Sequence, residues 1–380
     1  MDYLRRRRRI IATAAAVAAG GAACYAAYTF YRRGVAALTR DEGEDDPATT
    51  TTTAGPSSSS SSSHDDLEKA FRGVLEVVAT RGFATHRDRL VALLREGNTD
   101  GLTAALAALP KGGAKEKKLA LWQDLKVVSF AHAVGVVWGV ALLNALVSAQ
   151  LCVAARIGKD LADRDVAPGA LRQARTALEQ RMRKQVDAFI SGGTLATIAS
   201  KAKAASESAL RDVDLRRPMR FSELVGMLAC ISVTAEFEIG KPGGGWRAVL
   251  LPTDAAGNDE SDADALAGDA VADLERSLGA ALDRPEFAMA VSASARCVSD
   301  AVLARCERTF ASQAAKGAKG AKDAPLPAEA SLPLAKVVPL VATAADAITN
   351  ECEPIVRTQV APLPEVVRAC ADAFSVHRTL

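Results

Sequence analysis

Aromatic residues, histidine and paired cysteine motifs are scarce in this chain of 380 residues. Only 4% of the residues are aromatic and four are histidine. The apolar content is mostly Ala, Leu and Val, whereas strands favour aromatic and β-branched residues, so the composition predicts a helical protein. A formal charge of +2 argues against a basic surface spread over the whole protein, as nucleic-acid binding requires.

Sequence motifs for catalysis and metal binding are also missing. There is no H-E-x-x-H, no G-x-x-x-x-G-K-S/T and no G-x-S-x-G motif. The seven cysteines are scattered without C-x-x-C spacing, as expected of buried thiols in a reducing compartment. We therefore predict no metal, no cofactor and no enzymatic activity. His132 has no acidic residue or cysteine within four positions and is interpreted as a buried, hydrogen-bonded residue; a helical enzyme built around it is an alternative.

A long uncharged stretch dominates the middle of the chain. No Asp, Glu, Lys or Arg occurs between Lys126 and Arg156, and no proline occurs between Pro110 and Pro168. One long helix can run through most of this region. Such a helix could be buried in lipid or form the centre of a large helical bundle. We expect Val127 to Ala155 to be the buried centre of a bundle.

The amino terminus predicts a membrane anchor within residues 1–40. A basic block, Arg5 to Arg9, precedes 22 uncharged residues from Ile10 to Tyr31. As a helix these residues reach about 33 Å, enough for a hydrocarbon core of roughly 30 Å. Val17 lies inside this span, and Tyr28 and Tyr31 lie at its far end, where aromatic residues meet lipid headgroups. A cleaved signal of a secreted or lipid-anchored helical protein and an organelle transit peptide are the alternatives.

The composition then changes twice. Residues 41–66 are rich in Asp, Glu, Thr and Ser, which predicts a disordered linker. From residue 67 to 380 apolar residues recur at helical spacing, so we predict an all-α fold, a single large bundle of long helices carried by the N-terminal transmembrane anchor. A short helix is expected after the turn Asn98–Gly101, and loops are expected at 241–264 and 316–325. Later helices are expected from Pro168 to Gly192 and at roughly 194–213, 219–238, 263–282, 285–313, 332–350 and 363–377.

Trp122 stands at the polar start of the uncharged stretch, which suits either a half-buried core residue or an interface anchor. The sequence segments Lys118–Phe130 and Ser148–Leu151 resemble segments of the peroxin-3 family of peroxisomal membrane proteins. Asp283–Phe287 and Ser331–Leu340 resemble the same family, as does the order of anchor, linker and helical domain. The resemblance covers essentially the whole chain.

The resemblance implies a cytosolic helical domain that docks peroxin-19, the soluble receptor for new peroxisomal membrane proteins. In the family an amphipathic helix of peroxin-19 enters a hydrophobic groove around a tryptophan. By resemblance Trp122 and Lys118 are groove residues. Leu121 and Leu125 suit either groove or core. Leu106 and Leu109 are expected at the groove wall.

The function expected from this resemblance is a membrane-anchored docking factor that promotes insertion of peroxisomal membrane proteins. It would sit in the peroxisomal membrane as a single-pass protein, with the helical domain facing the cytosol. The positive-inside rule applied to Arg5–Arg9 gives the opposite orientation, and we follow the family. An organelle tether for inheritance or autophagy adaptors is the alternative within the same class.

Overall fold

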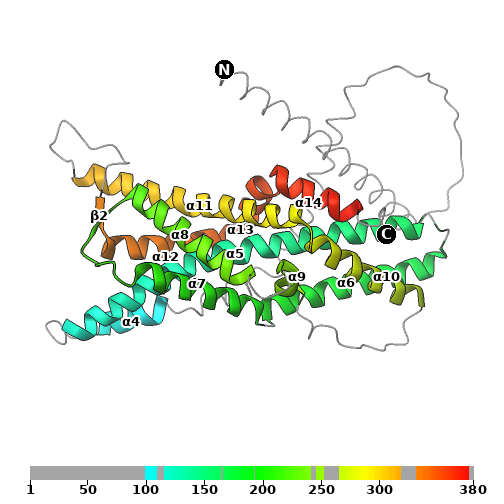
Figure 1. Cartoon of the computed structure of the whole chain (residues 1–380), viewed down its shortest axis with the longest axis horizontal. Helices are drawn as coiled ribbons and strands as arrows, with labels where there is room; N and C mark the ends of the chain where they lie inside the picture. Colours follow the sequence, from blue (N-terminus) through cyan, green and yellow to red (C-terminus); the bar gives the residue numbers. More distant parts are fainter. Residues whose placement is uncertain are drawn as a thin grey trace, which may run out of the picture.

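The computed structural model describes residues 99–108, most of 115–317 and 331–375; the interruptions are residues 163, 165, 192, 241–244 and 252–264. The predicted anchor 1–40, the predicted linker 41–66 and the beginning of the predicted helical domain, to residue 98, lie outside the described residues. Figure 1 shows the described part as a long bundle of helices lying roughly side by side.

One helix, α5 (Lys115–Ala162, 48 residues), runs through the middle of this bundle. It packs against α7, α11 and α12 most extensively, and against α4, α6, α10 and α14. The other helices are α4 (Thr99–Ala108), α6 (Pro168–Ser191), α7 (Thr194–Leu210), α8 (Phe221–Gly240), α9 (Gly245–Leu250), α10 (Ala265–Leu282), α11 (Pro285–Gly317), α12 (Leu334–Asn350), α13 (Cys352–Ile355), the π-helical turn η3 (Val356–Val360) and α14 (Pro364–Ser375).

The prediction of an all-α fold is confirmed, and several helix ends follow the sequence signals. α6 begins at Pro168, where the missing N–H costs no hydrogen bond because the first turn of a helix has no acceptor for it. Between α6 and α7 the chain passes through Gly193 with φ of 90°, a conformation that glycine adopts without steric cost. The sequence at this break therefore specifies where one helix ends and the next begins.

Three local features differ from the sequence-based expectations. α4 begins at Thr99, inside the residues assigned to a turn. The loop expected at 241–264 contains the short helix α9, where Trp246 stacks on Trp138 of α5. Two short strands, β1 (Pro218–Arg220) and β2 (Ser331–Pro333), pair antiparallel with Met219 opposite Leu332. Both the stacking and the pairing join distant parts of the chain, which helical periodicity does not report.

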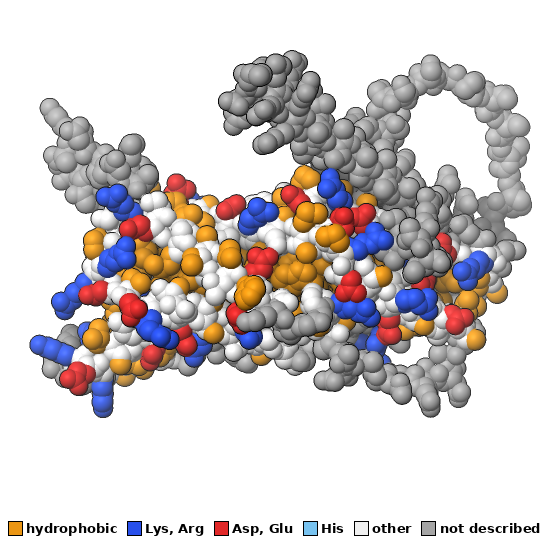
Figure 2. Space-filling model, in the orientation of Figure 1, with side chains coloured by type: hydrophobic (Ala, Val, Ile, Leu, Met, Phe, Trp, Pro, Cys, Tyr) orange, Lys and Arg blue, Asp and Glu red, His pale blue; other side chains and the backbone are white. Residues whose placement is uncertain are grey.

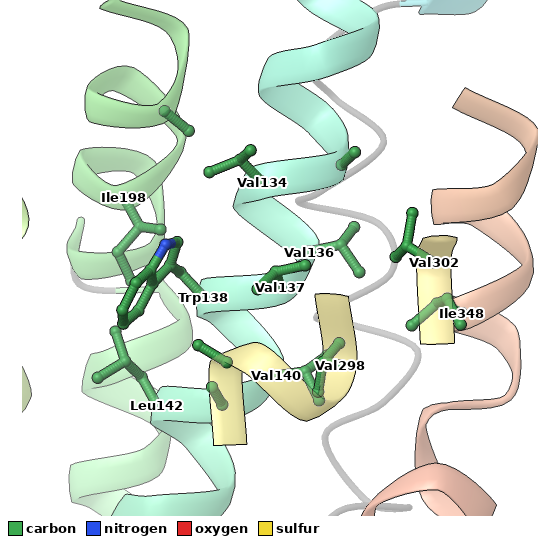
Figure 3. Packing of buried hydrophobic residues seen from close by; sticks show 14 of the residues in the cluster. Val134, Val136, Val137, Trp138, Val140, Leu142, Ile198, Val298, Val302 and Ile348 are labelled. Atoms are coloured by element: carbon green, nitrogen blue, oxygen red, sulfur yellow. The ribbon is translucent and has the colours of Figure 1, made fainter. Parts of the chain in front are cut away.

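The uncharged stretch is the core of the bundle. Every residue from Ser129 to Gln150 is buried in the structure. In Figure 3 Val136 of α5 lies beside Val302 and Ile348 of α11 and α12, Val140 lies beside Val298 of α11, and Trp138 lies beside Ile198 of α7. Two described helices, α5 and α11, are long and apolar enough to cross a membrane by length and composition. Protein buries 89% of the apolar window of α5 but 44% of that of α11.

The charged residue that ends the uncharged stretch is also buried. Arg156 is 4% exposed, and its guanidinium donates hydrogen bonds to Asp160 at 3.0 Å, to Asp273 at 3.0 Å and to Ser277 at 2.9 Å. A buried charge is tolerated only when it is paired, so these contacts fix α10 against α5. The interior of α5 thus ends in an ion-pair network at its carboxyl-terminal side.

Candidate functional site at the start of the central helix

The first three turns of α5 differ from the rest of the helix because they are largely exposed. Residues 115–120 are all exposed, while Trp122 is half-buried. Trp122 packs against the hydrophobic core, as do the half-buried Leu102 and Leu106 of α4. Figure 1 places α4 at the same end of the bundle as the start of α5, and the two helices are in contact. This end therefore presents an aromatic ring at the boundary between core and solvent.

The predicted site residues have different environments. Lys118 is exposed, Leu121 is half-buried, and Leu106 is half-buried on the neighbouring α4. Leu125 is only 6% exposed and belongs to the hydrophobic core. Leu109 lies outside the described residues. The structure thus brings Lys118, Trp122 and α4 to one end of the bundle and places Leu125 in the interior.

Leu119 is a surface residue that the sequence-based site did not include. It is 57% exposed, an unusual state for a leucine on a helix with a buried interior. Leu119 and Trp122 are three residues apart, so both lie on one face of α5. Its helical spacing from Trp122 is the sequence signal for this position. Leu119 extends the apolar surface at Trp122 by one turn.

The two tryptophans of α5 have opposite environments. Trp138 is 1% exposed, stacks on Trp246 at a centroid distance of 5.8 Å and donates from Nε1 to the Ser232 hydroxyl at 3.2 Å. Within the part of the chain that the structure describes, no aromatic ring stacks on Trp122. The interior residue has its polar and aromatic contacts satisfied inside the protein. The half-buried one keeps part of its ring available at the surface.

Charge around Trp122 is predominantly positive on its amino-terminal side. Lys115, Lys117 and Lys118 accompany a single acidic residue, Glu116, and all four are exposed. Asp124 is the next exposed acidic residue along α5. An apolar strip bordered by lysines is suited to an amphipathic helix whose polar edge carries acidic residues.

Other titratable side chains that could take part in chemistry are buried between the helices. His132 Nε2 lies 3.0 Å from Asp346 Oδ1, which joins α5 to α12, and the imidazole is buried. Burial raises the pKa of the Cys306 thiol to about 11, so this thiol is not a nucleophile at neutral pH. Among the described residues no group of three or more His, Cys, Asp or Glu side chains could hold a metal ion. Catalysis at His132 stays an alternative that loss of turnover in His132→Ala would support.

A second exposed apolar area lies on α8 and α11. Val233 and Phe237 of α8 are each 64% exposed, and Met289 of α11 is 46% exposed. Figure 2 shows hydrophobic side chains scattered over these helices on the facing side, with charged residues between them. The Ser292 hydroxyl donates to Glu236 at 2.6 Å and links the two helices there. This area lies outside the Trp122 end of α5 and supplies control positions for experiments.

Comparison with known proteins found no matching family model and no matching curated protein. The site is therefore characterised by its own geometry. That geometry consists of a half-buried tryptophan, an exposed leucine one turn earlier, a lysine-rich first turn and a neighbouring short helix. These residues present an apolar surface bordered by positive charge.

Proposed function

We propose that this protein is a membrane-anchored docking factor that binds cargo-loaded peroxin-19 and promotes insertion of peroxisomal membrane proteins. The observation that carries the proposal is the half-buried Trp122, placed beside exposed Leu119 and Lys118 at the start of a helix that is otherwise buried. The resemblance of the segment Lys118–Phe130 to the peroxin-3 family points to peroxin-19 as the partner. In this proposal the protein sits in the peroxisomal membrane through residues 1–40, with its helical domain facing the cytosol.

The binding mode is a helix in a groove. The apolar face of the incoming helix would cover Trp122 and Leu119, and its acidic edge would lie near Lys118. Burying a tryptophan of roughly 200 Å² at about 25 cal/mol per Å² gives an upper limit near 5 kcal/mol. Because Trp122 is already half-buried, its gain on binding is a fraction of that limit. We still expect Trp122 to be the dominant contact, because tryptophan is enriched among interface residues whose truncation costs about 2 kcal/mol or more.

The rigidity of the site supports this role. Trp122 stands one turn before Leu125 and Lys126, which are both buried, so its backbone belongs to the rigid part of α5. A surface built on a buried helix needs little ordering when the partner binds, which lowers the entropic cost of association. The incoming helix bears that cost instead. The proposal includes no catalytic step.

The proposal is tested by titrating a labelled peptide of the N-terminal helix of peroxin-19 against the full chain in detergent micelles. The matched control is a peptide of the same length with its apolar residues replaced by Gln. We expect saturable binding of the first peptide only. Absence of binding to the wild-type protein would overturn the proposed function.

The location of the surface is tested by repeating the titration with two variants. Trp122→Ala removes the proposed anchor, whereas Phe237→Ala removes an exposed aromatic ring on α8 of comparable size. We expect weak binding to the first variant and wild-type affinity for the second. Equal affinity of both variants would show that the partner binds somewhere else.

A further inference from the structure

Lys126 is a fully buried lysine at the border between the exposed start of α5 and its uncharged interior. It is 1% exposed. Its Nζ donates hydrogen bonds to the carbonyl of Leu210 at 2.8 Å and to the carbonyl of Val213 at 2.9 Å. Both acceptors lie on the other side of a helix interface, more than 80 residues away in sequence. A residue in such a position fixes one segment of backbone to another.

The Leu210 carbonyl is the last of α7, and the Val213 carbonyl lies three residues beyond it. The last carbonyls of a helix have no N–H donor within the helix and carry the negative end of its dipole, so a lysine is well suited to cap the end of α7. Burial lowers the pKa of Lys126, and the nearby carboxylates of Asp214 and Asp212 oppose that effect. The segment Arg211–Arg217 leads from α7 into β1. Lys126 holds this segment against α5 through its hydrogen bonds.

The same segment is held from its other side. The Leu334 N–H donates to the Arg217 carbonyl at 3.0 Å, and the Ala335 N–H donates to the Leu215 carbonyl at 2.9 Å. Beyond it, β1 pairs with β2. The segment Arg211–Arg217 is therefore clamped between the first turn of α12 and Lys126 of α5. Together with the packing of α7 on α5, the lysine fixes the position of this segment relative to α5.

Lys126 connects this segment to the face of α5 that carries Trp122. Lys126 and Trp122 are four residues apart and share a face of α5, and helical side chains lean toward the helix amino terminus, which brings Nζ back toward the turn of Trp122. Val213, whose carbonyl is 2.9 Å from Nζ, is half-buried and packs against the same hydrophobic core as Trp122. Asp212 and Asp214 on either side of it are exposed.

We infer that Lys126 is a positioning residue that holds the Arg211–Arg217 segment as one wall of the Trp122 site, with Val213 as its apolar contact to the incoming helix. The inference rests on the proposed function, since the incoming helix is the amphipathic peptide of peroxin-19. Trp122 and Leu119 contact one part of the apolar face of that peptide, and Val213 contacts its neighbouring edge. Lys126 itself touches no partner and acts only through the segment.

The charges around this wall are mixed and partly paired. Arg217 bonds Glu223 at 3.2 Å, and the Asp214 carboxylate accepts a hydrogen bond from the Arg216 N–H at 2.8 Å. Arg211 and Asp212 are exposed. Since neither sign dominates there, Val213 contributes through its apolar surface. Selection for acidic residues on the peptide comes from the lysines at the start of α5.

The first test substitutes Val213, which is half-buried and can be shortened without opening the core. In the peptide titration we expect Val213→Ala to weaken binding about threefold to tenfold, as loss of part of an apolar contact does. The matched control is Val233→Ala, the same substitution at an exposed position on α8, which should leave the affinity unchanged. Wild-type affinity in Val213→Ala would overturn the inference while leaving the proposed function intact.

The second test addresses Lys126 through its effect on the first. Lys126→Met keeps the unbranched side chain up to its last carbon and removes the donor nitrogen, and we expect it to weaken binding at least about tenfold. In that background Val213→Ala should have no further effect, because the segment is already displaced. Lys126→Arg, which keeps a charged donor, should recover most of the affinity. Additive losses in the double variant would contradict a role acting through the segment.

Hydrogen exchange separates positioning from general destabilisation, and keeps the test valid if Lys126→Met lowers stability. We expect amides in 211–217 to exchange faster in Lys126→Met, while those of α10 and α14 exchange as in wild type. Faster exchange throughout the bundle would mean that Lys126 supports the whole fold and would overturn the specific role. No binding of the peptide to wild type would remove the proposed function, and the inference with it.

Discussion

Two tryptophans on the same helix, sixteen residues apart, have different surroundings. Trp138 is 1% exposed, stacks on Trp246 and donates its indole N–H to Ser232. Trp122 is half-buried beside exposed Leu119 and Lys118. Both rings pack against the same hydrophobic core. One is enclosed by it, and the other forms its edge.

In the proposed function a single helix serves as both core and binding surface. From Ser129 to Gln150 α5 is covered on all sides by other helices, so every side chain there contributes to folding. Residues 115–120 of α5 are all exposed, Trp122 is half-buried, and α4 packs against α5 at the same end of the bundle. An apolar residue in the covered part stabilises the protein, whereas one at the uncovered end is available to a partner. Substitutions at the two tryptophans should therefore separate stability from affinity.

The largest expected effect is on stability in Trp138→Ala. Truncating a fully buried tryptophan removes its apolar burial and leaves a cavity, which costs about 3–5 kcal/mol in the free energy of unfolding. Urea unfolding followed by circular dichroism measures this loss. A change below about 1 kcal/mol would mean that Trp138 is not the packed interior residue of the structure.

Trp122→Ala is expected to give the reverse pattern. The peptide affinity should fall about 30-fold or more, corresponding to about 2 kcal/mol. The free energy of unfolding should fall by less than in Trp138→Ala, because part of the ring is already in solvent. Titration and urea unfolding on the same preparation give both numbers. A large loss of stability with unchanged affinity would make Trp122 a second core residue.

A smaller effect is expected from Ser232→Ala, which removes the acceptor of the Trp138 indole N–H. A buried donor left without a partner costs about 1–3 kcal/mol, and partial access of water to this hydroxyl puts the loss near 1 kcal/mol. The peptide affinity should stay at the wild-type value. Any change in affinity would show that the interior and the Trp122 site are coupled.

The smallest effect is expected from Lys118→Gln. An exposed lysine contributes about 0.2–1 kcal/mol to an ion pair, so the peptide affinity should fall up to about fivefold at low salt. The difference between variant and wild type should shrink as salt is raised, because exposed charges are screened within about 10 Å at 0.1 M ionic strength. An effect that is independent of salt would assign Lys118 a contact other than an ion pair.

The sequence was sufficient to predict most of the fold. The absence of charge and proline from the middle of the chain predicted α5, and Pro168 with Gly192-Gly193 predicted both ends of α6. The pairing of β1 with β2 and the stacking of Trp246 on Trp138 were not predicted, because each joins residues about a hundred positions apart. Periodicity describes which face of a helix is apolar and contains no information on which partner covers it.

The site could be predicted only in part. Trp122 and Lys118 were predicted as site residues from the resemblance of the segment Lys118–Phe130. Both lie in the first turns of α5, at the end of the bundle. The sequence left two alternatives for Leu125, the groove or the core. In the structure Leu125 is buried in the core. Lys126 reads in sequence as an ordinary charged residue that precedes an apolar run. Its contacts with Leu210 and Val213 depend on how α7 packs, so no local pattern could have shown them.

The most direct measurement of the central claim is fluorine NMR of the protein labelled with 5-fluorotryptophan. The chain contains three tryptophans, and Trp122→Phe identifies the resonance of Trp122. On addition of the peroxin-19 helix peptide, we predict a shift of the Trp122 resonance and unchanged resonances of Trp138 and Trp246. A bound peptide that leaves the Trp122 resonance where it was would contradict the assignment of this end of α5 as the docking site.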